Sequence, residues 1–242
     1  MPSVQLAPLT GGLALLQIDR PPANAIDLAL LDELVGAFKG IALARPRALV
    51  IAGRAGFFSA GINLKTVPHY GPDEQRRMVS GVNQMLLAAY GLELPVVAAV
   101  TGHAIGGGML LTLCADYRVA STTGRYGIPG VKVAVAYPQA AIGVARAELA
   151  PHAARRLMLG NRLIDADECV RQGAFDEALG PARVLDRALE MARELAALDT
   201  TMYARTKLEL RAAALGAMRV AAESDPLLAD RVEAGAGGGG GV

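Results

Sequence analysis

The strongest constraint on the fold is a run of 21 residues, 95–115, that contains no Asp, Glu, Lys or Arg. A charge-free run of this length could cross a bilayer as a helix. Its first part is instead rich in β-branched residues such as Val96 and Val97, and three glycines at 106–108 separate it from a part rich in Leu and Met. This order predicts a buried strand, a glycine turn and a buried helix, so we expect no membrane span.

Short apolar strands and helices alternate along the rest of the chain. Apolar runs predict strands at residues 13–18, 48–53, 95–100 and 116–120. Helical periodicity predicts helices at residues 28–38, 72–91, 107–115, 146–159, 165–172, 184–198 and 201–223. Residues 57–67 are expected to form loop and turn. The alternation is typical of an α/β domain.

These elements divide the chain into three predicted parts. Residues 1–183 form the α/β domain, and residues 184–233 form a helical C-terminal region. Residues 234–242 are mostly glycine and are expected to be a flexible tail, because such a segment cannot bury side chains.

Composition excludes several classes of protein. Lys and Arg number 24 against 23 Asp and Glu, and a net charge of +1 argues against a nucleic-acid binder. Cys114 and Cys169 lie far apart, so we expect neither a disulfide scaffold nor a zinc site, and a reducing compartment fits. The N-terminus has no basic segment followed by a long apolar one, so we expect no signal peptide and a cytoplasmic location.

Two glycine-containing segments carry the candidate chemistry: residues 57–65, after one strand, and residues 102–108, between a strand and a helix. Small residues let a ligand approach the backbone closely. Amides at a helix N-terminus lack an internal partner and present a partial positive charge. Two such amides from different loops would hold a carbonyl oxygen, and would hold it more strongly as it gains negative charge.

Other interpretations of the glycines remain open at this point. A phosphate-binding loop would need Lys and Ser or Thr after the glycines, and a dinucleotide fold would need G-x-G-x-x-G with a later acidic residue. Neither pattern occurs here. The glycines could also serve only to let a helix pack closely on a strand.

At these residues the sequence resembles the crotonase family, the enoyl-CoA hydratase/isomerase superfamily, over about residues 13–210. Residues 22–26 (PANAI) are similar to its early P-x-N-A-hydrophobic segment. Residues 58–64 (FSAGINL) are similar to its F-(S/A)-A-G-x-D-(L/I) loop, with Asn63 where Asp is usual. Residues 102–108 (GHAIGGG) are similar to its G-(Y/H)-A-(L/I)-G-G-G loop.

The resemblance implies a spiral of ββα turns with a C-terminal helical trimerisation region, homotrimers or hexamers, and an acyl-CoA or enoyl-CoA thioester as ligand. It implies no separate cofactor, because coenzyme A is part of the substrate. The oxyanion amides carried over by position are those of Ala60 and Gly107. The other substrate-binding positions that it implies are Ala25, Gly61, Ile62, Leu64, Lys65, Gly106, Leu110 and Gly130.

Two positions depart from the hydratase pattern. Hydratases of the family place glutamates at the positions of Leu110 and Gly130 in this chain. Leu110 lies three residues after Gly107, on the same helix face, and cannot move a proton. Each acid–base group contributes about 10²–10⁴-fold, so hydration is expected to be weak or absent. Restoring both carboxylates by Leu110→Glu and Gly130→Glu is expected to raise hydration by more than about 10²-fold.

Other side chains could replace the missing acid and base. We retain Tyr137, which borders the expected acyl chain, and His69, which follows the first loop, as catalytic candidates. The histidines have no metal-ligand spacing, so no metal site is expected. The roles expected for other polar residues are packing for His103, a strand or turn anchor for Asp116, a helix cap for Asp27 and an exposed position for His152.

Three functions follow from these patterns: an enzyme of the enoyl-CoA hydratase/isomerase class, a non-catalytic acyl-CoA binder, and an interaction protein that acts through its trimer surface. The last helix is expected to supply subunit contacts. Its expected apolar contact residues are Leu208, Leu210, Ala213, Leu215 and Met218, and its expected solvated residues are Arg205, Lys207, Glu209 and Arg211.

Overall fold

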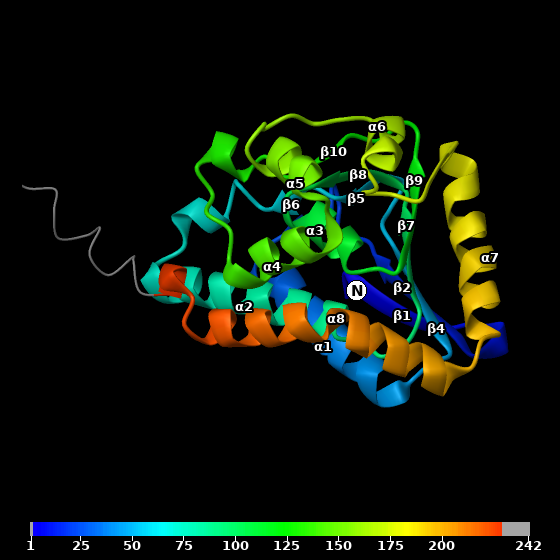
Figure 1. The fold of residues 1–242 in the computed structure, drawn as a ribbon. Helices are drawn as coiled ribbons and strands as arrows, with labels where there is room; N and C mark the ends of the chain where they lie inside the picture. The colour runs from blue at the N-terminus through cyan, green and yellow to red at the C-terminus, as the bar shows by residue number, and fades with distance from the viewer. Residues whose placement is uncertain (1, 229–242) are drawn as a thin grey trace, which may run out of the picture.

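The computed structural model describes residues 2–228, and its largest sheet is twisted and has six strands (Figure 1). The predicted glycine-rich tail lies outside the described residues. Within residues 2–228, no helix is both long and apolar enough to cross a membrane. The charge-free run instead forms β7 (Val96–Val100), β8 (Gly102–Ile105) and α3 (Gly107–Leu113). The predicted strand, turn and helix are confirmed, with β8 as an additional strand.

The six-stranded sheet has the order β1-β2-β4-β7-β9-β11. The β1–β2 pair is antiparallel and every other neighbouring pair is parallel. All residues of β4 and β7 are buried, which explains why these strands are continuous apolar runs. The strand bounds are β1 (Val4–Pro8), β2 (Leu13–Ile18), β4 (Ala48–Ala52), β9 (Tyr117–Ser121) and β11 (Glu177–Leu179).

A second strand follows each of β4, β7 and β9. These strands are β5 (Gly56–Ser59), β8 and β10 (Tyr126–Gly127), and they form a three-stranded parallel sheet. Each such pair of strands leads towards a helix, which gives the expected spiral of ββα turns. A separate parallel pair joins β3 (Ala25–Ile26) to β6 (Gly61–Ile62).

The prediction of loop and turn at residues 57–67 is therefore wrong in part, because β5 and β6 lie there. The turn between β4 and β5 is very tight: a Cβ atom added to Gly53 would lie within 3.0 Å of the Phe58 backbone. Strands this short, containing glycine, carry too little apolar alternation to be recognised.

The helices are mostly where the periodicity predicts them. The exception is residues 146–159, where the chain forms two helices instead of one. The first ends at Glu148, and Ala150, just before Pro151, is extended because a residue before proline avoids the helical conformation. The bounds are α1 (Leu28–Ala44), α2 (Pro72–Tyr90), α4 (Gln139–Glu148), α5 (Pro151–Met158), α6 (Ala166–Arg171), α7 (Val184–Ala196) and α8 (Thr200–Glu223).

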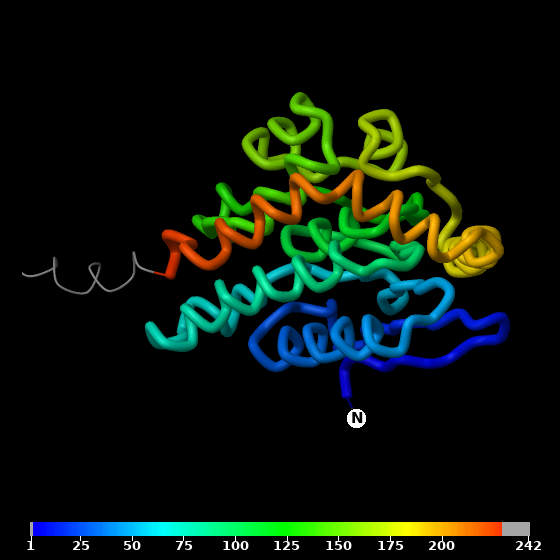
Figure 2. The backbone as a smooth tube through the Cα atoms, turned by 60° about the horizontal axis from the view of Figure 1, so that its bottom comes forward, coloured from blue at the N-terminus to red at the C-terminus, as the bar shows by residue number. Residues whose placement is uncertain are grey.

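Two helices near the C-terminus pack on opposite parts of the body. Helix α7 covers one face of the six-stranded sheet, and its small residues Ala188 and Ala192 lie against Val97 and Ala99 of β7. Helix α8 lies along α2 and α4 (Figures 1 and 2).

Helix α8 buries charged residues that were predicted to be solvated. Lys207 and Arg211 are buried inside the chain. Leu215 and Met218 are buried there too, which contradicts their predicted role as subunit contacts, whereas Leu210 is 82% exposed and remains free for such a contact. The prediction for Lys207 and Arg211 is therefore wrong. These residues are one turn apart, on the face of α8 that meets the rest of the chain.

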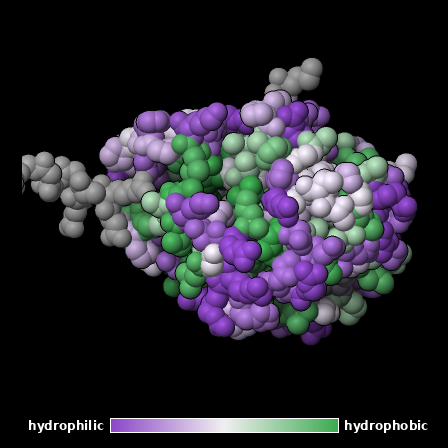
Figure 3. Space-filling model, turned by 90° about the horizontal axis from the view of Figure 1, so that it is seen from above, coloured by the Kyte–Doolittle hydropathy of each residue, from purple (hydrophilic) through white to green (hydrophobic). Residues whose placement is uncertain are grey.

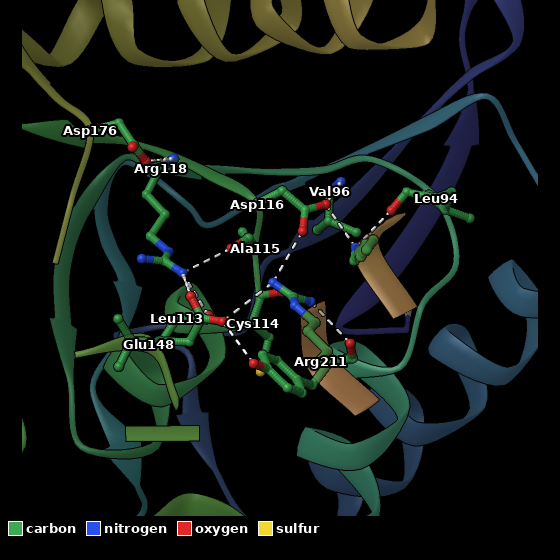
Figure 4. A network of polar contacts seen from close by, with 12 residues as sticks. Leu94, Val96, Leu113, Cys114, Ala115, Asp116, Arg118, Glu148, Asp176 and Arg211 are labelled. Atoms are coloured by element: carbon green, nitrogen blue, oxygen red, sulfur yellow. Dashed lines mark hydrogen bonds and ion pairs between the residues drawn. The ribbon is translucent and has the colours of Figure 1, made fainter. Parts of the chain in front are cut away.

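An ionic cluster under α8 explains this burial (Figure 4). One oxygen of Asp116 accepts hydrogen bonds from the Val96 amide at 2.8 Å and from Lys207 Nζ at 2.7 Å. Arg211 lies 3.0 Å from the other oxygen and also reaches Glu148. Burial lowers the pKa of Lys207 to about 8, although the Asp116 charge opposes this shift. Buried charges of this kind are tolerated because each has several partners.

Candidate functional site

An apolar cavity of about 200 Å³ lies between the two glycine loops and helices α2, α3 and α4. Among the described residues that line it, the polar side chains are Gln75 and Tyr137, and none is a carboxylate, lysine or histidine. The apolar lining comprises Ile62, Leu64, Val67, Met78, Val79, Val82, Ile105, Leu110, Val133, Val135, Ala141 and Leu227, among others. Such a cavity suits an aliphatic group and offers few groups that can move protons.

The rim of the cavity reaches the surface. Leu64 and Val133 line the cavity and are 47% and 42% exposed. On the face seen in Figure 3, hydrophobic residues also reach the surface in strips between polar ones. The cavity therefore has apolar side chains both inside and at its rim.

The second glycine loop gives α3 a free N-terminal amide. Gly106 joins β8 to α3 with φ +54° and ψ −118°, a conformation that residues with a Cβ rarely adopt. Helix α3 begins at Gly107, whose amide has no acceptor within the helix. Gly106 and Gly107 both line the cavity, as predicted for substrate-binding residues.

The first glycine loop lies directly against the second. A Cβ atom on Gly61, which has φ +77°, would lie within 3.0 Å of the Ile105 carbonyl oxygen and 3.1 Å from the Gly107 amide nitrogen. Only glycine permits this approach. The two loops that the sequence singled out are therefore brought together at one edge of the cavity.

The structure contradicts Ala60 as the free amide of the first loop. The Ala60 N–H donates a hydrogen bond of 2.9 Å to the Ala23 carbonyl oxygen. In the β3–β6 pair, the Asn63 N–H donates to the Ile26 carbonyl oxygen at 2.8 Å. In a parallel pair, alternate residues point their amides to opposite sides, so the Ile62 amide points away from β3. Ile62, which lines the cavity, is the residue whose amide is available.

Leu110 and Gly130 both line the cavity but supply no acid or base. Leu110 lies one turn into α3 from Gly107 and is only 2% exposed. Gly130 begins the short helix η3 (Gly130–Val133) and also lines the cavity. The positions at which the resemblance implies carboxylates are thus an apolar side chain and a bare backbone.

Tyr137 lines the cavity, but its hydroxyl is fully engaged with backbone. It accepts a hydrogen bond from the Gly130 N–H and donates one of 2.6 Å to the Ile128 carbonyl oxygen. Burial raises the pKa of Tyr137, and the bond from Gly130 opposes the shift. These contacts give Tyr137 a positioning role towards the Gly130 loop and disfavour its predicted role as acid or base.

The remaining predicted site residues lie outside the lining. His69, at the end of η2 (Val67–His69), and Lys65 are exposed, whereas Val67 faces the cavity. Ala25 pairs with Gly61 in the β3–β6 pair behind the loop. The structure therefore does not bring His69 to the cavity, and its predicted catalytic role has no support.

The polar residues expected to be structural have that role. His103 Nδ1 accepts a hydrogen bond from the Arg125 amide and its ring packs 4.8 Å from Phe57. Asp27 caps α1 by accepting from the Leu30 amide. Asp116 anchors the start of β7, as described above, and His152 is exposed on α5.

Other lining residues were not predicted from the sequence. Gln75 and Met78 come from α2, and Leu227 comes from η5 (Pro226–Leu228), beyond α8. Helical periodicity could have placed Gln75 and Met78 on one face of α2. No local signal indicates that Leu227 meets α2, because the two are far apart in the chain.

Comparison with known proteins identifies the family. A model of the family described as enoyl-CoA hydratase/isomerase matches residues 9–225. The probable enoyl-CoA hydratase EchA17 of Mycobacterium tuberculosis is 31% identical over 185 residues, 75% of this chain and 70% of that protein. The carnitinyl-CoA dehydratase of Escherichia coli is 29% identical over 187 residues, 76% of this chain and 71% of that protein.

Solved structures agree over nearly the whole chain. The crystal structure of the probable enoyl-CoA hydratase EchA3 of Mycobacterium tuberculosis has a TM-score of 0.88 at 29% identity, and the match covers 96% of this chain and 98% of that one. The fold is therefore shared over nearly the whole chain. The chain belongs to the enoyl-CoA hydratase/isomerase family, the crotonase superfamily.

Proposed function

We propose that this protein binds an acyl-CoA or enoyl-CoA thioester, with the thioester carbonyl oxygen between the backbone amides of Ile62 and Gly107. The observation that carries the proposal is the meeting of these two loops at the edge of an apolar cavity. Two preorganised amides bind a carbonyl oxygen and stabilise it further when an enolate forms, each by about 3 kcal/mol. Leu64 and the exposed Lys65 border the path proposed for coenzyme A.

The lining limits what chemistry can follow binding. Among the described residues that line the cavity, the polar side chains are Gln75 and Tyr137, and the Tyr137 hydroxyl is engaged by backbone. Hydration of an enoyl thioester needs a group that activates water and a group that delivers a proton to the α carbon. Without them the reaction loses about 10²–10⁴-fold for each group. Ordinary hydratase activity is therefore expected to be weak or absent.

The alternative is a non-catalytic acyl-CoA binding protein on the same fold. The apolar side chain of Leu110 favours it, because a helix position next to the oxyanion amide is filled without an acid. Both functions need the same thioester site. They differ only in whether bound thioester is converted.

One titration and one assay test the proposal. Isothermal calorimetry with crotonyl-CoA is expected to show saturable binding, and the ultraviolet absorbance of the enoyl thioester then reports any hydration. Gly107→Pro removes the amide donor at a position where proline fits a helix start. Gly107→Ala is the matched control, because it keeps the amide and adds only a Cβ atom 3.3 Å from a flexible Ile26 methyl group.

The expected result separates the functions. Gly107→Pro should weaken ground-state binding of the thioester by about 1 kcal/mol. It should raise the activation free energy of any step through an enolate by about 2.7–4 kcal/mol. Gly107→Ala should stay close to wild type in both measurements. Binding of crotonyl-CoA without turnover supports the non-catalytic acyl-CoA binding protein. No saturable binding by the wild-type protein would refute both and leave the interaction protein.

Assembly and location belong to the same proposal. A homotrimer or hexamer is supported by the outward face of α8, where Met202, Leu210 and Val220 are exposed. This face of α8 is the one that the proposal assigns to the subunit contact. The two free, buried thiols, Cys114 and Cys169, fit the reducing environment of the cytoplasm.

A further inference from the structure

The cavity wall includes a residue from the far end of the described chain. Leu227 of η5 lines the cavity together with Val82 of α2 and Ala141 of α4. Figure 1 shows this segment, in red, at the end of α8 that is remote from the six-stranded sheet, whereas α3 lies nearer the strands. Leu227 therefore belongs to the part of the cavity wall that η5 forms with α2 and α4, whereas Gly107 belongs to the part formed by the start of α3.

A buried carboxylate fixes this segment to the body of the protein. Asp225 is 2% exposed. Its Oδ2 accepts hydrogen bonds from the Gln139 amide at 2.8 Å and from Asn83 Nδ2 at 2.9 Å. Its Oδ1 accepts from the Leu227 amide at 3.1 Å. One side chain thus joins α2, α4 and η5, and we refer to Asp225 with Asn83 and the Gln139 amide as the Asp225 clamp.

Capping of α4 alone does not account for this geometry. The first amides of a helix need acceptors, and Asp225 Oδ2 and Asn83 Oδ1 satisfy those of Gln139 and Ala140. The second oxygen of Asp225 accepts a hydrogen bond from the amide of Leu227, the residue whose side chain lines the cavity. The clamp therefore sets the position of a cavity wall as well as a helix terminus.

We propose that Leu227, held by the Asp225 clamp, closes the acyl cavity and determines how long an acyl chain the protein accepts. This inference rests on the proposed thioester site and adds its substrate class: an uncharged aliphatic acyl group, because the described residues that line the cavity include no charged side chain. Each further methylene that fits should raise affinity about fourfold, and methylenes that meet Leu227 should raise it no further.

The test measures binding of butyryl-, octanoyl-, dodecanoyl- and hexadecanoyl-CoA to the full chain by isothermal calorimetry. Leu227→Ala removes the wall and is expected to raise the affinity ratio of the longer chains to the shorter ones by at least about tenfold. The matched control is Leu228→Ala, because Leu228 is a half-buried neighbour outside the cavity lining. It should keep the wild-type ratio.

Asp225→Ala tests the clamp itself. It should raise the affinity ratio of the longer chains to the shorter ones, as Leu227→Ala does. Circular dichroism checks that this variant is folded. If it does not fold, the comparison of Leu227→Ala with wild type decides the question. Equal ratios for Leu227→Ala, Leu228→Ala and wild type would overturn the inference and leave the proposed thioester site intact. Absence of binding by the wild-type chain to all four thioesters would overturn the site and the inference together.

Discussion

Single residues decide whether this cavity can be turned into a hydratase site. A Cβ atom on Gly130 would lie within 3.0 Å of the Tyr137 hydroxyl and ring, and of the Val135 carbonyl oxygen. Tyr137 thus occupies the space that a side chain at position 130 needs. The expectation that Leu110→Glu and Gly130→Glu together restore activity is therefore revised, because the second substitution has no room.

The revised prediction adds a third substitution. The Leu110→Glu, Gly130→Glu double variant should gain no hydration over Leu110→Glu and should lose about 1–3 kcal/mol of stability through overpacking. Adding Tyr137→Ala removes the ring, so that only the Val135 carbonyl oxygen, 2.8 Å from the Cβ position, still has to shift. The triple variant should raise hydration by at least about 10²-fold over the double variant. Enoyl thioester absorbance and urea unfolding of each variant measure both effects. Equal stability of Gly130→Glu in the presence and absence of Tyr137 would contradict the steric argument.

At the scale of elements, α8 shows that a helix can be held by charge where its sequence suggests solvent exposure. Lys207 Nζ donates to both the Asp116 carboxylate and the Leu94 carbonyl oxygen, and its side chain is 5% exposed. Removing one partner of a buried pair leaves the other charge uncompensated. Arg211 would still neutralise Asp116 in part, so the cost should fall at the lower end of the usual range.

Lys207→Met should therefore destabilise the protein by about 3 kcal/mol in urea unfolding at neutral pH. Arg205→Met, on the exposed face of the same helix, should change stability by less than about 0.5 kcal/mol. If the two variants unfold at the same urea concentration, the ionic cluster does not hold α8 on the body.

The elements also show what the sequence could and could not predict. The strands at 13–18 and 95–100 and the glycine turn before α3 were predictable, because buried strands and helix starts leave local signals. The pairing of residues 23–26 with residues 60–63 was not, because its hydrogen bonds join segments far apart in the chain. This pairing engages the Ala60 amide and leaves that of Ile62 pointing away from β3. The burial of Lys207 and the Asp225 clamp were missed for the same reason: polarity alone predicts exposure, and only the partner residues reverse it.

At the scale of the whole molecule, buried groups that titrate at high pH make stability depend on pH. Burial raises the pKa of the Cys114 thiol from 9.0 to about 12, and raises that of Tyr117 to about 12. It also raises the pKa values of Cys169 and Tyr126. For such groups the unfolded chain loses its proton first, so their contribution is complete below the unfolded pKa and is lost as pH rises towards the folded pKa.

Lys207 acts in the opposite direction over part of this range. Its folded pKa of about 8 lies below the unfolded value of 10.5, so between these values the unfolded chain binds more protons and stability rises with pH. The two effects oppose each other up to pH 10.5. Above pH 10.5, of the groups named here only the cysteine thiols and tyrosine hydroxyls still bind protons differently in the folded and unfolded protein. The free energy of unfolding should therefore fall steeply with pH.

Cys114→Ala isolates one group in that range. Each group that is deprotonated only in the unfolded chain contributes a slope of about −1.4 kcal/mol per pH unit. Between pH 10.5 and 12 the variant should therefore lose stability more slowly than the wild type by about this amount per pH unit, whatever the substitution costs at neutral pH. Urea unfolding at several pH values, with reductant present, measures both slopes. Parallel slopes would mean that the Cys114 thiol ionises equally well in the folded protein, which is incompatible with its complete burial beneath α8 and α2.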